Sequence, residues 1–236
     1  MFVTCVVVTS AVRVPIPSVV EAEITRLFTS SGYAQYYSEP VSHVEHALQC
    51  AQIAEDEGHS DDVVVAALLH DIGHISAAPG SQHMHRDGMD VGVMDHEVVG
   101  AAWLRQRGFS EQLCSLVQSH VESKRYLCAT NATYYATLAS DSVRSLSFQG
   151  GPMNASEVAA FDAREDAADR VALRTFDERG KKRGKKTQLL EHFIAKARRH
   201  LDARAAATAH ELPRQAVPRR LRRRRAAVAA GGEAHN

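Results

Sequence analysis

The stretch VVVAALLHDIGHI, residues 63–75, constrains the fold of this chain more than any other. Seven consecutive apolar residues lead directly into His70 and Asp71, and His74 follows about one helical turn later. An acidic pair precedes the apolar run, which suits the positive end of a helix. Burying an imidazole beside a carboxylate costs free energy unless each has a partner. The stretch therefore predicts a buried helix that ends at a polar site inside the protein.

Helical patterns dominate the rest of the chain. Capping residues, apolar stripes at helical spacing and terminating residues recur in six further segments, at 17–32, 42–58, 95–108, 110–127, 155–180 and 186–201. The first segment is expected to begin with a Ser18 cap and to end at Gly32. No alternating pair of strands is evident, so the polar stretch 76–94 is expected to be a loop at the edge of a site. The predicted fold class is an all-α helical bundle.

Charge is distributed unevenly along the chain. Residues 1–178 hold 11 Lys and Arg against 24 Asp and Glu, whereas residues 179–236 hold 17 against 4. We expect three parts: a short apolar N-terminal extension over 1–14, the bundle over 15–202 and a basic low-complexity tail over 203–236. No aromatic residue is interleaved among the arginines of the tail, which favours a solvated extension over a nucleic-acid contact.

The cysteines and the hydropathy of the chain indicate the cellular compartment of the protein. The four cysteines show neither zinc spacing nor a dense disulfide pattern, which favours reduced thiols in a cytoplasmic protein. The sequence contains no apolar run long enough to span a membrane. Nothing in the sequence fixes the oligomeric state.

Histidines and aspartates recur beside the apolar stripes of successive predicted helices. The set consists of His46, His70, Asp71, His96, His120 and Asp177. Helical bundles build metal sites from inward-facing residues of separate helices. Imidazole and carboxylate without thiolate suit iron, manganese or a similar divalent metal better than a structural zinc. Six ligands are too many for one metal that keeps open positions, so the set predicts two metals bridged by Asp71, whose two oxygens can face both ions.

These motifs carry a resemblance to a known family. The pattern of His46, His70-Asp71 and Asp177 resembles the HD-domain superfamily, and the stretches DHEVVGAAWL, SHVESKRYL and LSFQGGPM are similar to one branch of it. That branch is the PhnZ-type mixed-valence diiron oxygenases, which cleave the carbon–phosphorus bond of hydroxylated phosphonates such as 2-amino-1-hydroxyethylphosphonate. The resemblance covers about residues 18–200. It implies one iron held by His46, His70, Asp71 and Asp177, and a second iron held by Asp71, His96 and His120.

A second group of residues suits an anionic substrate. Lys124 lies one helical turn beyond His120, and Arg174 lies three residues before Asp177, so each shares the face of a predicted ligand. With the hydroxyl of Ser142, these cations suit a tetrahedral phosphonate. The resemblance implies that Lys124, Ser142 and Arg174 hold the phosphonate and that His74 lies close to the bound substrate.

The stretch YYSEP precedes the first ligand helix and contains two further candidates. The resemblance implies that Tyr36 is a gate that occupies the site until substrate binds, and that Glu39 is a counter-ion for the substrate's amine. A partly buried carboxylate needs a cationic partner, so Glu39 is expected to meet that amine, with a trimethylammonium group as the alternative. His43 stands where the family more often has glutamine, which leaves the substrate open.

The predicted function is an iron-dependent oxygenase that uses O2 to convert a 1-hydroxyalkylphosphonate into phosphate and a carboxylate such as glycine. The main alternative is a metal-dependent HD-domain phosphohydrolase acting on a nucleotide or other phosphate ester. Two others are a diiron oxygenase acting on a polyol and a non-enzymatic scaffold that binds a partner through its tail. A neutral polyol needs no cluster of Lys124, Ser142 and Arg174, and a degenerate scaffold would have lost ligands, which this sequence has not.

Overall fold

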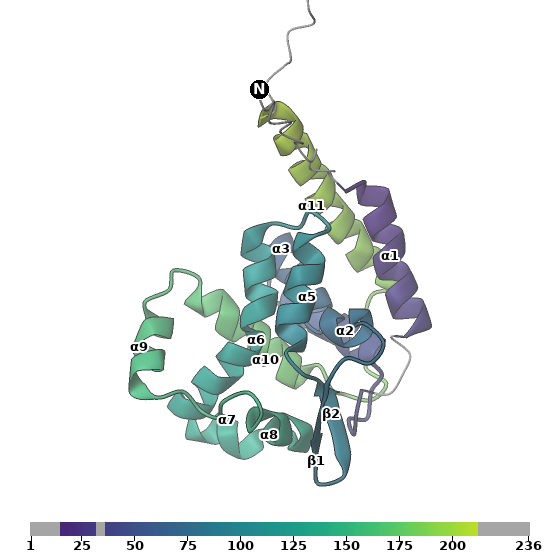
Figure 1. Cartoon of the computed structure of the whole chain (residues 1–236). Helices are drawn as coiled ribbons and strands as arrows, with labels where there is room; N and C mark the ends of the chain where they lie inside the picture. The colour runs from purple at the N-terminus through teal and green to yellow at the C-terminus, as the bar shows by residue number, and fades with distance from the viewer. Residues whose placement is uncertain (1–14, 32–35, 212–236) are drawn as a thin grey trace, which may run out of the picture. The chain divides into compact units, whose positions relative to one another are not determined.

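The computed structural model describes residues 15–31 and 36–211 of the chain. These residues form eleven helices and one two-stranded hairpin (Figure 1). In chain order the elements are α1 Pro17–Ser30, α2 His43–Asp56, α3 Asp61–Leu69, α4 Ile72–Ser76, β1 His83–Arg86, β2 Met89–Val93, α5 His96–Arg105, α6 Glu111–Thr130, α7 Ala132–Thr137, α8 Ser140–Leu146, α9 Ala155–Asp162, α10 Ala167–Arg179 and α11 Leu190–Glu211. The prediction of an all-α fold is confirmed, with one small hairpin added.

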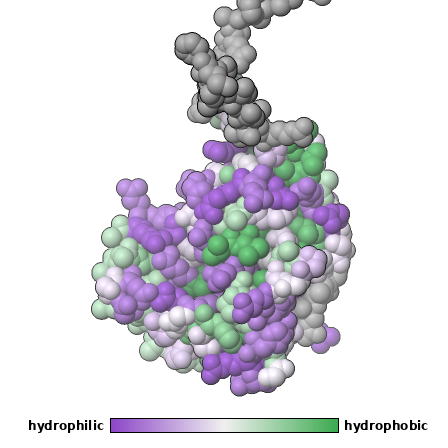
Figure 2. Space-filling view, viewed as in Figure 1, coloured by the Kyte–Doolittle hydropathy of each residue, from purple (hydrophilic) through white to green (hydrophobic). Residues whose placement is uncertain are grey.

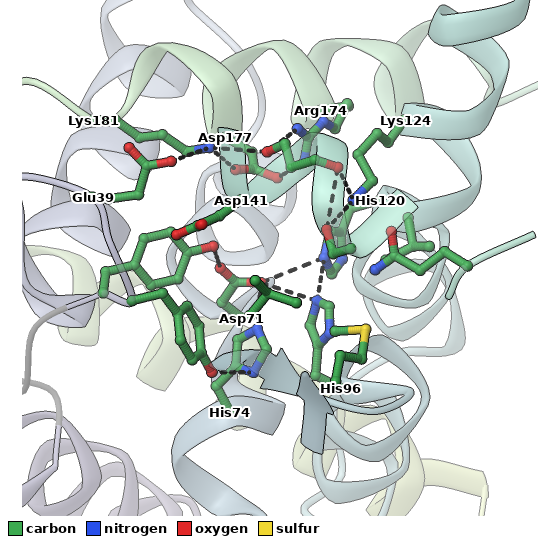
Figure 3. A pocket seen from close by; sticks show the side chains of 18 residues that line it. Glu39, Asp71, His74, His96, His120, Lys124, Asp141, Arg174, Asp177 and Lys181 are labelled. Atoms are coloured by element: carbon green, nitrogen blue, oxygen red, sulfur yellow. Dashed lines mark hydrogen bonds and ion pairs between the residues drawn. The ribbon is translucent and has the colours of Figure 1, made fainter. Parts of the chain in front are cut away.

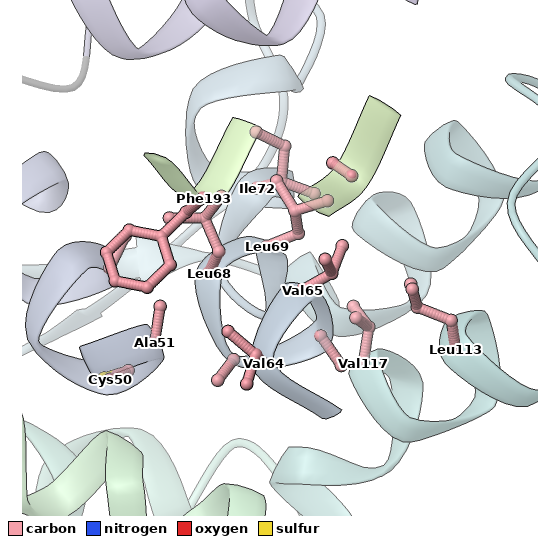
Figure 4. Close-up of a cluster of buried hydrophobic side chains, with 14 of the residues drawn as sticks. Cys50, Ala51, Val64, Val65, Leu68, Leu69, Ile72, Leu113, Val117 and Phe193 are labelled. Carbon is pink, nitrogen blue, oxygen red and sulfur yellow. The ribbon is translucent and has the colours of Figure 1, made fainter. Parts of the chain in front are cut away.

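Helix α3 lies at the centre of the hydrophobic core. All seven of its residues from Val63 to Leu69 are at most 4% exposed. Side chains of α2, α6 and α11 surround it, among them those of Ala51, Val117 and Phe193 (Figure 4). Burying each valine or leucine stabilises the fold by about 1.5–3 kcal/mol. Because α3 is held on every side, the polar residues at its C-terminal end are placed rigidly.

Serine caps fix where three of the long helices begin. Ser42 and Glu45 form a reciprocal capping box at α2, while Ser60 and Ser110 accept hydrogen bonds from the third backbone N–H of α3 and α6. The expected Ser18 cap of α1 is wrong. Pro17 takes the first helical position instead, where its missing N–H and fixed φ are favourable. Gly32, the expected end of this segment, lies outside the described residues.

The expected loop at 76–94 contains the hairpin β1–β2. Its strands pair antiparallel, with Arg86 opposite Met89. The two-residue turn between them is Asp87-Gly88, whose φ angles of 54° and 76° are both positive. That conformation is typical of a hairpin turn, and Asp-Gly is a preferred sequence for it. The loop prediction was therefore wrong in structure, although the stretch does line a site, as shown below.

The segment 155–180, expected to be one helix, is two helices, α9 and α10. The ring of Phe161, in α9, stacks on Tyr126 of α6 with 4.3 Å between centroids. In α10, Arg170 donates to the hydroxyl of Ser115 at 2.6 Å and to Asp166 at the start of its own helix. Helices α9 and α10 thus contact α6 at two separate places. These tertiary contacts outweigh the helical propensity of the residues that connect α9 to α10. Helices α7 and α8 were not predicted.

The chain divides into a compact unit that ends at Ala205 and a second unit from Ala206, of which the structure describes only the helical residues up to 211. Helix α11 thus reaches nine residues into the range expected to be a basic tail. The predicted extension at 1–14 and the rest of the tail lie outside the described residues. Figure 2 shows hydrophilic residues over much of the face viewed, interrupted by apolar patches. Within the described ranges, no helix combines the length and hydropathy needed to cross a membrane.

Candidate metal centre

Asp71 lies between two pairs of histidines. Its Oδ2 atom is 3.2 Å from Nε2 of His70 and 3.6 Å from Nε2 of His46. Its Oδ1 atom is 3.4 Å from Nε2 of both His96 and His120. We call His46 and His70 the first pair, and His96 and His120 the second pair. Each carboxylate oxygen faces one pair, which is the arrangement expected of a residue that bridges two metals.

A close approach of backbones brings Asp71 to the second pair. Asp71 precedes α4, and His96 is the first residue of α5. A Cβ atom at Gly73 would lie 1.9 Å from the carbonyl oxygen of His96 and 2.9 Å from the backbone nitrogen of Gly100. Only glycine therefore fits there, because any side chain would separate α4 from α5. This contact explains the glycine of the HDIGH stretch.

The four histidines make the same kind of hydrogen bond through Nδ1. Each places Nδ1 close to a backbone carbonyl oxygen: His46 to Gly180 at 3.1 Å, His70 to Ala67 at 2.8 Å, His96 to Val93 at 3.3 Å and His120 to Val117 at 2.7 Å. Since a carbonyl oxygen can only accept a hydrogen bond, Nδ1 carries the proton in each case. The ring atom that each histidine turns toward Asp71 is therefore Nε2, the atom with which a neutral imidazole whose Nδ1 is protonated would bind a metal ion.

Within each pair the two Nε2 atoms face each other. They are 3.2 Å apart between His46 and His70, and 3.0 Å apart between His96 and His120. Two lone pairs at this distance repel each other unless a proton or a metal ion lies between them. Asp177 adds an acceptor, because its Oδ1 atom is buried and has no hydrogen-bond partner among the described residues. Its distance to Nε2 of His46 is 3.5 Å. The donor set of imidazole nitrogens and carboxylate oxygens thus fits divalent metal ions.

Cys50 also lies beside the first pair, and the sequence analysis did not foresee it. Its Sγ atom is 3.8 Å from both ring nitrogens of His46. Equal distances to the two nitrogens place the sulfur off the lone-pair direction of Nε2. The thiol also donates to the carbonyl of Phe176 at 3.4 Å. Cys50 therefore packs against His46 and is poorly placed to be a ligand.

His74 carries its proton on the opposite nitrogen. Its Nδ1 accepts a hydrogen bond from the backbone N–H of Val93 at 3.2 Å, and the hydroxyl of Tyr37 is 2.9 Å from the same atom. Because a backbone N–H can only donate, Nδ1 is unprotonated and Nε2 carries the hydrogen. Burial and the neighbouring imidazole of His96 hold the pKa of His74 well below its usual value. His74 is thus a neutral donor, 3.9 Å from Oδ1 of Asp71, and not a ligand.

Tyr36 closes the site on the side of the first pair. Its hydroxyl donates to Oδ2 of Asp71 at 2.5 Å, and its ring stacks on His46 with 4.4 Å between centroids. The cavity beside the cluster has a volume of only about 40 Å³, which has room for a few water molecules. Tyr36 is one of the side chains that line this cavity, and its role as a gate stays a prediction.

The three residues expected to hold a phosphonate, Lys124, Ser142 and Arg174, all line this cavity. Lys124 and Arg174 are labelled in Figure 3. Nζ of Lys124 donates to the hydroxyl of Ser145 at 2.9 Å, and Arg174 donates to the hydroxyl of Ser142 at 3.3 Å. Burial, with the charge of Arg174 second, lowers the pKa of Lys124 to about 7. Arg174 also forms an ion pair with Asp177. That charge holds the pKa of Asp177 well below its usual value, although burial alone would raise it.

Two residues that the sequence analysis missed hold the YYSEP stretch in place. Asp141 accepts from the backbone N–H and the hydroxyl of Ser38, at 2.8 and 2.5 Å. Nζ of Lys181 lies 3.5 Å from a carboxylate oxygen of Glu39. The expectation that Glu39 pairs with the substrate's amine assumed that no cationic side chain of the protein lies beside it. Lys181 is such a side chain, so the assumption was wrong. Lys181 lies four residues after Asp177, a spacing that could have indicated a side chain near the same site. It was overlooked because it belongs to a run of basic residues.

Comparisons with known proteins agree with this geometry. The HD domain family model matches residues 43–204. The chain is 40% identical over 176 residues to the [1-hydroxy-2-(trimethylamino)ethyl]phosphonate dioxygenase (glycine-betaine-forming) of Leisingera caerulea, covering 75% of this chain and 87% of that one. It is 36% identical over 158 residues to the hydroxymethylphosphonate dioxygenase of Gimesia maris, covering 67% and 77%. The two histidine pairs around a shared aspartate thus lie in a chain that belongs to the HD domain family.

Proposed function

We propose that this chain is an iron-dependent HD-domain oxygenase that uses O2 to cleave the carbon–phosphorus bond of a 1-hydroxyalkylphosphonate. One substrate and one O2 would yield one phosphate and one carboxylate, such as glycine from 2-amino-1-hydroxyethylphosphonate. The observation that carries the proposal is that Asp71 and the second pair open onto a cavity lined by buried Lys124 and Arg174. Similarity to two proteins named as phosphonate dioxygenases supports the same reaction.

The proposed cofactor is a mixed-valence pair of iron ions. His46, His70, Asp177 and one oxygen of Asp71 would hold the first ion, and the second pair with the other oxygen of Asp71 would hold the second. The pair would supply the redox activity and Lewis acidity that activate O2 and polarise the substrate, while the four electrons that reduce O2 come from the substrate. All these ligands lie within the proposed catalytic region 15–202. The cytoplasmic location stays a prediction.

The side chains of the cavity would bind and orient the phosphonate. Lys124 and Arg174 supply charge-assisted hydrogen bonds to its oxygens, and Ser142 supplies a hydroxyl. These contacts fix the hydroxylated carbon beside Asp71, which is the positioning that the reaction needs. Across the cavity, the N–H of His74 would donate to an oxygen of the bound substrate. Tyr36 would leave Asp71 to admit the substrate.

Aromatic rings surround Tyr36, the residue that would move to admit the substrate. Tyr36 and Tyr37 lie edge-on to the ring of His43, with centroids 4.9 and 5.4 Å away. Burial lowers the pKa of His43 to about 4, so this ring is neutral. Uncharged aromatic rings suit the trimethylammonium group in the substrate name of one relative as well as a primary amine. The substrate test below therefore uses both groups.

The test compares three substrates on iron-loaded protein: hydroxymethylphosphonate, 2-amino-1-hydroxyethylphosphonate and its trimethylammonium analogue. O2 uptake and phosphate release are measured together, and we expect equal amounts of each for at least one substrate. Strict anaerobiosis should abolish phosphate release. Release at the aerobic rate without O2, or hydrolysis of phosphate esters in place of all three phosphonates, would establish the phosphohydrolase alternative.

A further inference from the structure

Lys181 reaches the substrate cavity from just beyond the end of α10. Its side chain is only 9% exposed. Its Nζ atom lies 3.3 Å from the hydroxyl of Ser142 and 3.5 Å from the carboxylate of Glu39. Figure 3 shows it between Glu39 and Asp177, on the same side of the cavity as Arg174 and Lys124. Nothing in the sequence analysis assigned a role to this lysine.

The backbone around Lys181 is fixed against α2. A Cβ atom at Gly180 would lie 2.5 Å from Sγ of Cys50, so this approach requires glycine. The carbonyl of Gly180 accepts the hydrogen bond from His46, and the side chain of Gln49 pairs with both the N–H and the carbonyl of Lys182. Two adjacent lysines are thereby placed differently. Lys181 lies in the cavity, whereas the side chain of Lys182 is exposed.

Three cations converge on Ser142. Its hydroxyl oxygen accepts from Arg174 and from Lys181, each at 3.3 Å, and its backbone carbonyl lies 3.5 Å from Nζ of Lys124. Two charged donors occupy the lone pairs of the hydroxyl, so its own hydrogen is available to an acceptor in the cavity. A tetrahedral dianion beside Ser142 would therefore meet four donors, of which Lys181 is the fourth.

The ammonium group of Lys181 also lies near three carboxylates. Besides Glu39, its Nζ lies 3.6 Å from Glu178 and 4.0 Å from Asp177. Of these neighbours, Glu39 belongs to the turn that carries Tyr36, the residue proposed above to move when substrate binds. A dianion at Ser142 attracts the ammonium group more strongly than one carboxylate at 3.5 Å does. Movement of the turn and arrival of the dianion therefore both favour transfer of Lys181 from Glu39 to the substrate.

We propose that Lys181 is a further phosphonate-binding residue, and that it exchanges Glu39 for the phosphonate when substrate binds. The proposal deepens the function proposed above and rests on it. The exchange takes one cation away from Glu39, which favours a cationic group at the other end of the substrate beside this carboxylate. Substrates with both a phosphonate and an ammonium group satisfy both partners. An anion without a cationic group, such as inorganic phosphate, must compete with Glu39 for Lys181.

The test measures binding of inorganic phosphate and methylphosphonate to the iron-loaded, full-length chain by titration calorimetry. Lys181→Met should weaken binding of both by about tenfold or more, since a charge-assisted contact is lost. Lys182→Met is the matched control, because it removes the same charge one residue away, and it should bind as wild type does. Glu39→Gln should bind both probes several-fold more tightly, because it releases Lys181.

The double variant separates exchange from simple repulsion. If Glu39 weakens phosphate binding by holding Lys181, the gain from Glu39→Gln should disappear in the Lys181→Met background. A gain of the same size in both backgrounds would overturn the exchange. Equal affinities of wild type, Lys181→Met and Lys182→Met would overturn the binding role. O2 uptake measured on the same preparations keeps this question apart from the reaction type, because a phosphohydrolase with this cavity would show the same binding pattern.

Discussion

The two histidine pairs that share Asp71 lie in different surroundings. Beside the first pair there is a second carboxylate, Asp177, and the ring of Tyr36 covers His46. Beside the second pair, the carboxylate within 4 Å that faces the Nε2 atoms is Asp71 itself, and His74 stacks on His96 with 3.9 Å between centroids. The first pair therefore has more anionic donors and less open space than the second pair.

The cavity lies on the side of the second pair, although Asp177 and Tyr36 also line it. Of the described residues that line it, His96 and His120 come from the second pair and none comes from the first pair. The cations Lys124, Arg174 and Lys181 line it as well. We infer that the phosphonate would bind beside the second pair, while displacement of Tyr36 would expose the first pair. If both halves bind metal, two half-sites joined by one carboxylate would then have separate tasks.

The largest expected effect comes from removing the residue that both halves share. Asp71→Ala should lose both metals, because each pair would lose the carboxylate oxygen that faces it and a bridged pair cannot form. Metal analysis of purified protein should fall from about two ions per chain to near zero, and O2-dependent turnover should cease. Wild-type protein with one ion per chain, retained in Asp71→Ala, would rule out a bridged pair.

His120→Ala should affect only the metal site formed by the second pair and Oδ1 of Asp71. The first pair keeps Asp177 and an oxygen of Asp71, so metal content should fall from about two to about one ion per chain, with turnover lost. His85→Ala, a change at an exposed histidine of the hairpin, is the control and should retain both ions. Loss of both metals in His120→Ala would mean that the halves are not independent.

Lys124→Ala should weaken substrate binding without emptying either half. One charge-assisted contact is worth about 1.5–3 kcal/mol, so kcat/KM should fall by at least about tenfold while metal content is unchanged. Lys185→Ala removes an exposed lysine from the same chain and should behave as wild type. Wild-type kinetics in Lys124→Ala would exclude this lysine from the substrate cavity.

The same lysine predicts a pH dependence. Burial lowers the pKa of Lys124 to about 7, so in the free protein its ammonium form is present below that pH and is lost as pH rises through it. Only the ammonium form attracts a phosphonate, and kcat/KM should decline on the alkaline side of about pH 7. Lys124→Arg stays charged throughout this range and should flatten the decline. An unchanged profile in that variant would assign the decline to another group.

The cluster of candidate metal ligands around Asp71 could be predicted from the sequence because its residues follow local patterns. His46 and His120 each lie within a long helix whose apolar stripe fixes the inward face, and His70-Asp71 ends the most apolar segment of the chain. The Asp87-Gly88 turn was also readable, since its sequence is a preferred hairpin turn. It was missed because the strands it joins are short and not strictly alternating.

The contacts around the cavity were harder to predict from the sequence than the cluster around Asp71, because they join distant parts of the chain. Ser38 and Asp141, whose contact holds the turn that carries Tyr36 and Glu39, are 103 residues apart in sequence. Lys181 meets Glu39 only after α10 has packed on α2, and nothing in a basic run distinguishes Lys181 from Lys182. Tyr37 reaches His74 through a backbone with φ of 53°, a conformation that a tyrosine rarely adopts and that sequence patterns do not indicate.

The smallest expected effect tests how the second half holds His74. Tyr37→Phe removes one hydrogen bond to Nδ1 of His74 but keeps the ring, and the N–H of Val93 still donates to the same atom. A neutral hydrogen bond contributes about 0.5–1.5 kcal/mol, so kcat should fall by about two- to tenfold, with little change in KM or metal content. Nitrogen NMR of the histidines should show the hydrogen of His74 still on Nε2, because a backbone N–H can only donate. Movement of that hydrogen to Nδ1 would show that Tyr37, and not Val93, selects the tautomer, and an equal loss in kcat and metal content would show that Tyr37 supports the second pair itself.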